Sequence, residues 1–121
     1  MATYSKIVLS GSTDGRGILV DDAATAGKTI HTGSSTATTY DEVWIYAANY
    51  DSSDRKLTIE WGSASAGDII ESTITTEAGL VLVIPGLILK GNASTALEVR
   101  AFAATTSSIQ LFGFVNRIDA A

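Results

Sequence analysis

Short runs of β-branched and aromatic residues, separated by clusters of Gly, Asn, Asp and Ser, recur along the whole chain. No stretch of ten or more residues combines the 3.6-residue apolar repeat of an amphipathic helix with helix caps. Runs of this length and spacing are typical of sandwiches and barrels. We therefore expect an all-β fold, a single-domain antiparallel β-sandwich or partly open β-barrel of about eight to ten short strands.

The expected strands follow these runs. They cover residues 6–10, 17–20, 29–32, 42–49, 56–61, 69–75, 80–84, 87–90, 97–104 and 108–118. Residues 50–55 are polar and turn-prone, so we expect the strands on either side to form a hairpin. Residues 84–87 place Pro85 and Gly86 as a type II turn requires, which favours a tight turn over one long strand bulged at the proline.

Alternation within the strands assigns side chains to faces. Val43, Ile45 and Ala47 share one side of their strand, whereas Trp44 and Tyr46 share the other. Tyr40 and Tyr50 extend this aromatic row at even offsets. We expect this row to belong to the core or to a subunit interface rather than to a platform that binds a small ligand. If the row belongs to the core, Val43 and Ile45 lie on the less buried side of the strand.

The strand expected over residues 108–118 is apolar on both sides. Ile109, Leu111 and Val115 oppose Phe112 and Phe114. One sheet face cannot bury both sets. The strand is therefore either central in a closed architecture, or its second face meets another subunit.

Length and composition exclude several classes of protein. The 121 residues suffice for one domain, 1–121, in which we expect residues 1–5 to form a flexible contact arm. The net charge of −5 disfavours a nucleic-acid partner. Charged residues make up 17%, against about 25% in typical soluble domains, so either a partner covers some surface or Ser and Thr do. We expect no export signal and no membrane segment, because the longest apolar run, residues 80–89, is short and interrupted by Pro-Gly.

Candidates for chemistry are few, since the chain has no cysteine and one histidine, His31. Residues 26–29, Ala-Gly-Lys-Thr, lack the first glycine of a phosphate-binding loop, and the acidic loops lack the spacing of a calcium site. Glu60 and Glu71 fall on strands that could be neighbours, but outward carboxylates on strands are common. We expect no enzymatic activity, no catalytic or metal-binding residues and no cofactor.

Several segments together resemble a known family. They are residues 6–11 (KIVLSG), 15–18 (GRGI), 29–31 (TIH), 41–46 (DEVWIY), 79–86 (GLVLVIPG), 99–103 (VRAFA) and 112–117 (FGFVNR). The chain is similar to the small head decoration, or cement, proteins that tailed bacteriophages encode beside the major capsid protein. The similarity spans most of the chain and rests on structural residues.

This resemblance implies a virion structural protein, made in the host cytoplasm, that binds the outer capsid lattice and stabilises the head. Its partners would be the major capsid protein and further copies of itself, with a trimer favoured over a dimer. The interface candidates are Ala2, Thr3 and Tyr4 in the N-terminal arm, and Trp44 and Tyr46 in the aromatic row. The alternatives are a phage tail, baseplate or fibre domain, and a carbohydrate-binding module that stacks sugars on Trp44, Trp61 and Tyr46.

Overall fold

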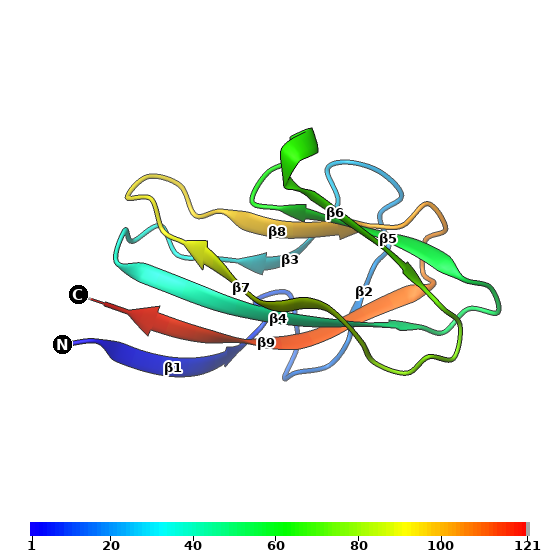
Figure 1. The fold of residues 1–121 in the computed structure, drawn as a ribbon, viewed down its shortest axis with the longest axis horizontal. Helices are drawn as coiled ribbons and strands as arrows, with labels where there is room; N and C mark the ends of the chain where they lie inside the picture. The colour runs from blue at the N-terminus through cyan, green and yellow to red at the C-terminus, as the bar shows by residue number, and fades with distance from the viewer. Residues whose placement is uncertain (121) are drawn as a thin grey trace.

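Two antiparallel sheets pack face to face in the computed structural model, which describes residues 1–120 (Figure 1). The strands are β1 (Thr3–Val8), β2 (Ile18–Leu19), β3 (Lys28–Thr32), β4 (Thr39–Asn49), β5 (Arg55–Trp61), β6 (Ile69–Ile74), β7 (Val81–Lys90), β8 (Glu98–Phe102) and β9 (Ile109–Asp119). A single turn of 3₁₀-helix, Ala66–Asp68, precedes β6. Sheet A has the order β1-β9-β4-β7, with β2 also paired to β9, and sheet B has the order β3-β8-β5-β6. The expected β-sandwich is confirmed.

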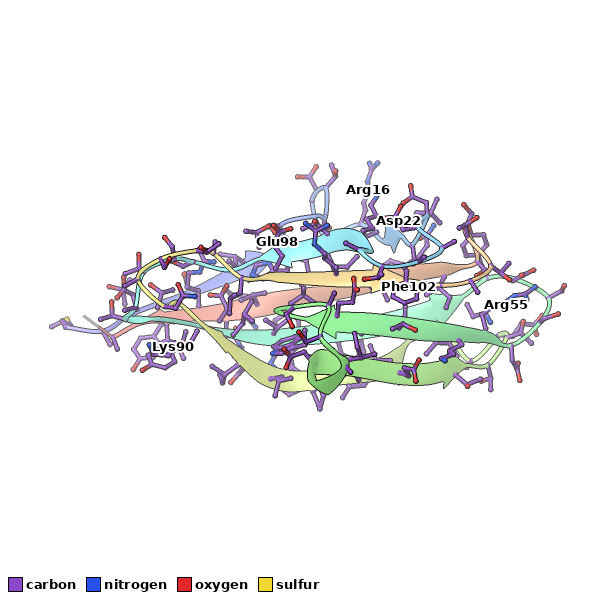
Figure 2. The ribbon with its side chains drawn as sticks, turned by 90° about the horizontal axis from the view of Figure 1, so that it is seen from above. Arg16, Asp22, Arg55, Lys90, Glu98 and Phe102 are labelled. Atoms are coloured by element: carbon purple, nitrogen blue, oxygen red, sulfur yellow. The ribbon has the colours of Figure 1, made fainter. Side chains whose placement is uncertain are left out.

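The long strands β4 and β9 form the centre of sheet A. They pair antiparallel over their full length, from Thr39 opposite Asp119 to Asn49 opposite Ile109. Because Thr3 pairs with Asp119, the start of β1 and the end of β9 lie at the same end of the molecule, where the two strands run side by side (Figure 1). Arg55, at the start of β5, and Lys90, at the end of β7, lie at opposite ends of the long axis (Figure 2).

The prediction of a hairpin around residues 50–55 is wrong. β4 belongs to sheet A and β5 to sheet B, so the polar loop between them carries the chain from one sheet to the other. The apolar sides of the two strands explain this arrangement. Ile45 on β4 and Ile59 on β5 are both buried in the core between the sheets, whereas hairpin strands would have placed their apolar sides on one common sheet face.

The tight turn expected at residues 84–87 is also wrong, because β7 continues through Pro85 and Gly86. Trp44 on β4 pairs with Pro85 and Val43 pairs with Leu87, so Gly86 is the extra residue of a bulge. Gly86 has a φ of +77°, as a type II turn would have required at this position. The two residues do indicate the local backbone angles, but pairing with β4 makes them a glycine bulge rather than a turn.

The core lies between the sheets and is built from the inward residues of both. Its fully buried members include Val43, Ile45 and Ala47 of β4, Leu57 and Ile59 of β5, Val99 and Ala101 of β8, and Ile109, Leu111 and Val115 of β9. The prediction that Val43 and Ile45 are the less buried side of β4 is wrong. Trp44 and Tyr46 consequently point away from the core, on the outer side of sheet A. No helix within residues 1–120 is long and apolar enough to cross a membrane.

Candidate interaction surface

The outer side of sheet A carries a continuous set of apolar and aromatic side chains, which we call the aromatic face. It consists of Tyr4 and Val8 on β1, Phe112 and Phe114 on β9, Trp44 and Tyr46 on β4, and Leu82, Pro85 and Ile88 on β7, and the polar residues Lys6, Glu42 and Asn116 lie among them. All four neighbouring strands contribute, because residues paired across the sheet share a side.

Cross-strand pairing brings the large rings together. Trp44 lies directly opposite Phe114, with ring centroids 6.0 Å apart and planes inclined by 11°, and Tyr46 lies opposite Phe112. The ammonium group of Lys6 lies 4.8 Å from the centre of the Phe114 ring. These contacts hold the rings in fixed positions before any partner binds. The entropic cost of ordering these side chains on binding is therefore smaller.

Glu42 fixes the indole of Trp44. Trp44 Nε1 donates a hydrogen bond of 2.8 Å to Glu42 Oε1, and Asn116 Nδ2 donates another of 2.9 Å to the same oxygen. These two hydrogen bonds lower the pKa of Glu42, so its carboxylate remains an acceptor in mildly acidic solution. The aromatic face therefore has one fixed negative charge beside its largest ring.

Much of the aromatic face meets water. Val8, Leu82 and Ile88 are 45%, 44% and 46% exposed, and Tyr4 is 73% exposed. The outer side of an antiparallel sheet is normally polar where it faces solvent. A contiguous apolar set of this kind, in contrast, is typical of a surface that binds another macromolecule.

The outer side of sheet B is mostly polar instead, with Phe102 and Ile69 as its apolar members. Glu60 on β5 is only 1% exposed, because the loop before β3 covers it. Its carboxylate accepts hydrogen bonds from the Thr25 hydroxyl and, at 2.7 Å, from the Gly27 backbone N–H. Arg100 on β8 donates to the Gly27 carbonyl at 3.0 Å and forms an ion pair of 3.0 Å with Glu98. Figure 2 shows Glu98 on β8 beside β3.

These contacts also settle the relation between Glu60 and Glu71. Their strands β5 and β6 are neighbours, as expected, but Glu60 pairs with Ile69 whereas Glu71 pairs with Thr58. Glu71 is exposed and forms an ion pair of 2.6 Å with Lys56. Since both oxygens of Glu60 are engaged by the covering loop, Glu60 acts here as a structural anchor for that loop.

His31 belongs to a buried polar network that joins the sheets. His31 Nε2 on β3 lies 2.8 Å from Asp41 Oδ2 on β4, and Arg117 on β9 donates two hydrogen bonds, of 2.7 and 2.8 Å, to the two oxygens of Asp41. The backbone N–H of Ser10 donates to His31 Nδ1 at 3.0 Å. Because Nδ1 accepts, Nε2 carries the proton and donates to Asp41. The sequence predicts a hydrogen-bonded histidine in the middle of a strand, and His31 is one. The sequence did not identify its hydrogen-bond partners.

The surroundings of Asp41 set its pKa. Burial raises it, but hydrogen bonds from Arg117 and His31, together with the charge of Arg117, outweigh burial and hold the pKa at about 2. The same contact raises the pKa of Arg117. Asp41 therefore stays ionised down to strongly acidic pH.

This lowered pKa predicts a specific acid sensitivity. An unfolded chain binds a proton on Asp41 near its ordinary pKa of 3.8, whereas the folded chain does so near 2. The resulting stabilisation of about 2 kcal/mol is complete above the unfolded value and is lost as the pH falls from there through 2. Urea unfolding at pH 6, 4 and 2.5 should show this loss, and the Asp41→Asn variant should lose correspondingly less stability over the same interval. An equal loss in both proteins would contradict the assignment.

The structure separates the residues singled out from the sequence. Trp44 and Tyr46 lie on the aromatic face, as does Tyr4. Thr3 and Tyr4 are part of β1 and pair with β9, rather than forming a free arm, and Ala2 immediately precedes β1. Trp61 lies on β5 of the other sheet and packs against the core, so it cannot share a stacking face with Trp44 and Tyr46.

Sequence reasoning did not assign Phe112, Phe114, Leu82 and Ile88 to this surface. The two-sided apolar pattern of residues 108–118 was the signal for the phenylalanines, and it left a second subunit as one explanation. For β7 the signal was hidden, because two extra residues shift its register against β4, between Val43 and Trp44 and between Ile45 and Tyr46. Simple alternation fails across such shifts.

Within residues 1–120, no group of three or more His, Asp or Glu side chains is arranged to hold a metal ion. No protein-family model matches this chain, and no curated protein sequence matches it either. The molecule is thus defined by its β-sandwich fold and by the contrast between its two outer faces.

Proposed function

We propose that this protein is a non-enzymatic structural component of a tailed-phage virion, a head decoration protein that binds the outer capsid lattice through its aromatic face. The observation that carries the proposal is the apolar outer side of sheet A, where Trp44, Phe114 and Ile88 stand on a rigid sheet and meet water. The resemblance to cement proteins suggests which macromolecule covers it.

The physical mechanism would be linkage. A protein that binds the assembled lattice, and not its dissociated subunits, stabilises the lattice by mass action at every occupied site. Such a protein needs a rigid scaffold and apolar area to bury, and the β-sandwich supplies both. Trp44 and Phe114 have the character of interface anchors, since aromatic residues held in place dominate binding energy in many protein interfaces.

The mostly polar outer side of sheet B suits exposure to solvent. There the charges are already paired within the molecule, as with Arg100 and Glu98 or Lys56 and Glu71. We therefore assign the aromatic face to the capsid and the outer side of sheet B to the surroundings of the particle.

A pair of adjacent substitutions tests this orientation. Ile88 and Leu87 follow each other on β7 and are 46% and 42% exposed, but Ile88 pairs with Glu42 and lies on the aromatic face, whereas Leu87 pairs with the inward residue Val43. Ile88→Lys should weaken binding to heads that lack the protein by about a hundredfold, because it places a charge on the apolar side of β7 that the capsid would cover. Leu87→Lys should bind like the unmodified chain.

The measurement is co-sedimentation of the purified proteins with expanded heads, with bound copies counted per particle. Saturable binding at a number that matches capsid symmetry, together with heads that survive higher temperature, is the expected result. If the unmodified chain does not bind, the capsid proposal fails. Equal binding of both lysine variants and the unmodified chain would instead reject the aromatic face as the contact.

A further inference from the structure

We propose that two copies of this chain associate edge to edge through β1, so that sheet A continues across a two-fold axis into the second copy. This inference is independent of the capsid proposal. β1 is an edge strand of sheet A and pairs on one side with β9 (Figure 1). Within residues 1–120, no strand pairs with its other side.

The hydrogen bonds of β9 show which groups of β1 point outward. Ala120 N–H donates to the Thr38 carbonyl on the β4 side, so the backbone groups of Asp119, one residue earlier, point toward β1. Asp119 pairs with Thr3, and Arg117 and Val115 pair with Ser5 and Ile7. By the same alternation, the N–H and C=O groups of Tyr4, Lys6 and Val8 point to the free edge.

Apart from the exposed Lys6, this edge lacks the features that protect edge strands from pairing. Its sequence, Thr-Tyr-Ser-Lys-Ile-Val, contains no proline or glycine, and its pairing with β9 has no bulge. Its one charge, on Lys6, is held over the Phe114 ring on the aromatic face. The opposite edge of sheet A, β7, contains Pro85 and two register shifts, which blunt it.

The edges of sheet B are less suited to pairing. β3 has a bulge between Thr29 and His31, and β6 carries the exposed carboxylate of Glu71 in its middle. β1 is also exposed on both sides along nearly its whole length, with Ile7 the one residue of intermediate exposure. An approaching strand would therefore meet no covering side chains or loops.

The partner that fits this edge is a second copy of the same chain, because no complementary strand from another protein is needed. An antiparallel strand edge is complementary to itself under a two-fold axis, because each outward N–H meets an outward C=O of the other copy. An axis through Ser5 pairs Tyr4 with Lys6 of the second copy and forms four backbone hydrogen bonds. An axis through Lys6 would place two lysines directly opposite each other, which is unfavourable.

Amide hydrogen exchange at high and low protein concentration tests the proposal. In a single copy the amides of Ser5 and Ile7 are protected by β9, whereas those of Tyr4 and Lys6 exchange freely. In the dimer all four should be protected, and sedimentation should show the doubled mass. Lys6→Pro removes an outward N–H without removing a bond to β9, and should weaken dimerisation by at least about tenfold. Lys6→Ala keeps that N–H and should still dimerise.

A cysteine supplies a second test that does not depend on proline. The chain has no cysteine, so Ser5→Cys introduces a single thiol at the proposed axis. Facing residues of a non-hydrogen-bonded antiparallel pair lie about 4.5 Å apart between Cα atoms, within the range of a disulfide. Mild oxidation should cross-link Ser5→Cys rapidly, and Ser94→Cys, in an exposed loop, slowly. A protein that stays monomeric at all concentrations, or equal cross-linking of the two variants, would overturn the proposal.

Discussion

Replacement of Asp41 by Ala is expected to cost about 3 kcal/mol of the free energy of unfolding. Asp41 is 1% exposed and accepts hydrogen bonds from both Arg117 and His31. Removing the carboxylate leaves a guanidinium and an imidazole N–H without their acceptor between the sheets. This loss of stability is at the lower end of the range for broken buried ion pairs. The reason is that the Arg117 side chain is 31% exposed and can still reach water.

Asp21→Ala is the matched control. Asp21 also forms an ion pair, with Lys28 at 3.4 Å, but its side chain is 47% exposed. Its removal should change stability by less than about 1 kcal/mol. Urea titrations of the two variants and the unmodified chain give the comparison. Similar unfolding midpoints for Asp41→Ala and Asp21→Ala would show that the buried network contributes nothing beyond a surface pair.

Replacement of Gly113 by Ala is expected to destabilise the fold by a similar amount, about 3 kcal/mol. Gly113 lies in the middle of β9, opposite Ile45. A Cβ atom at this position would overlap the backbone carbonyl oxygen of Trp44. Since backbone atoms rather than a flexible side chain are in the way, β4 and β9 must move apart at the centre of sheet A.

Gly67→Ala serves as the control for this substitution. No heavy atom lies within 4 Å of a Cβ built on Gly67, which belongs to the short 3₁₀-helix before β6. Its effect should stay within about 0.5 kcal/mol. Thermal unfolding followed by circular dichroism distinguishes the two variants. An unfolding temperature of Gly113→Ala equal to that of Gly67→Ala would mean that the pair of central strands accommodates the extra methyl group.

Much of the fold could be predicted from local patterns. Alternation of apolar and polar residues, with Gly, Asn and Asp between the runs, located the strands to within a few residues and identified the all-β class. Alternation also showed correctly that Trp44 and Tyr46 share a side opposite Val43 and Ile45. The composition of residues 108–118 indicated that one strand would be apolar on both sides, and left open whether that strand is central in a closed architecture or meets another subunit.

The candidate site was predictable only in part. Trp44, Tyr46 and Tyr4 were named from the sequence, but Phe114 joins Trp44 through pairing between strands that are 70 residues apart in the chain (114 − 44). The buried network of His31 and Asp41 was hidden in part for the same reason, because its third member, Arg117, reaches Asp41 from the far end of the sequence. Contacts of this range depend on strand order, which no local pattern encodes.

The sequence by itself determined where strands form and which side chains share a side, because both follow from the two-residue repeat of an extended backbone. Tertiary structure alone decided which side faces inward, since that depends on which strands build the second sheet. It placed β4 and β5 in different sheets, made Pro85-Gly86 a bulge instead of a turn, and directed Val43 and Ile45 into the core. The aromatic rings of β4 and β9 were thereby left on the outside, where a partner can cover them.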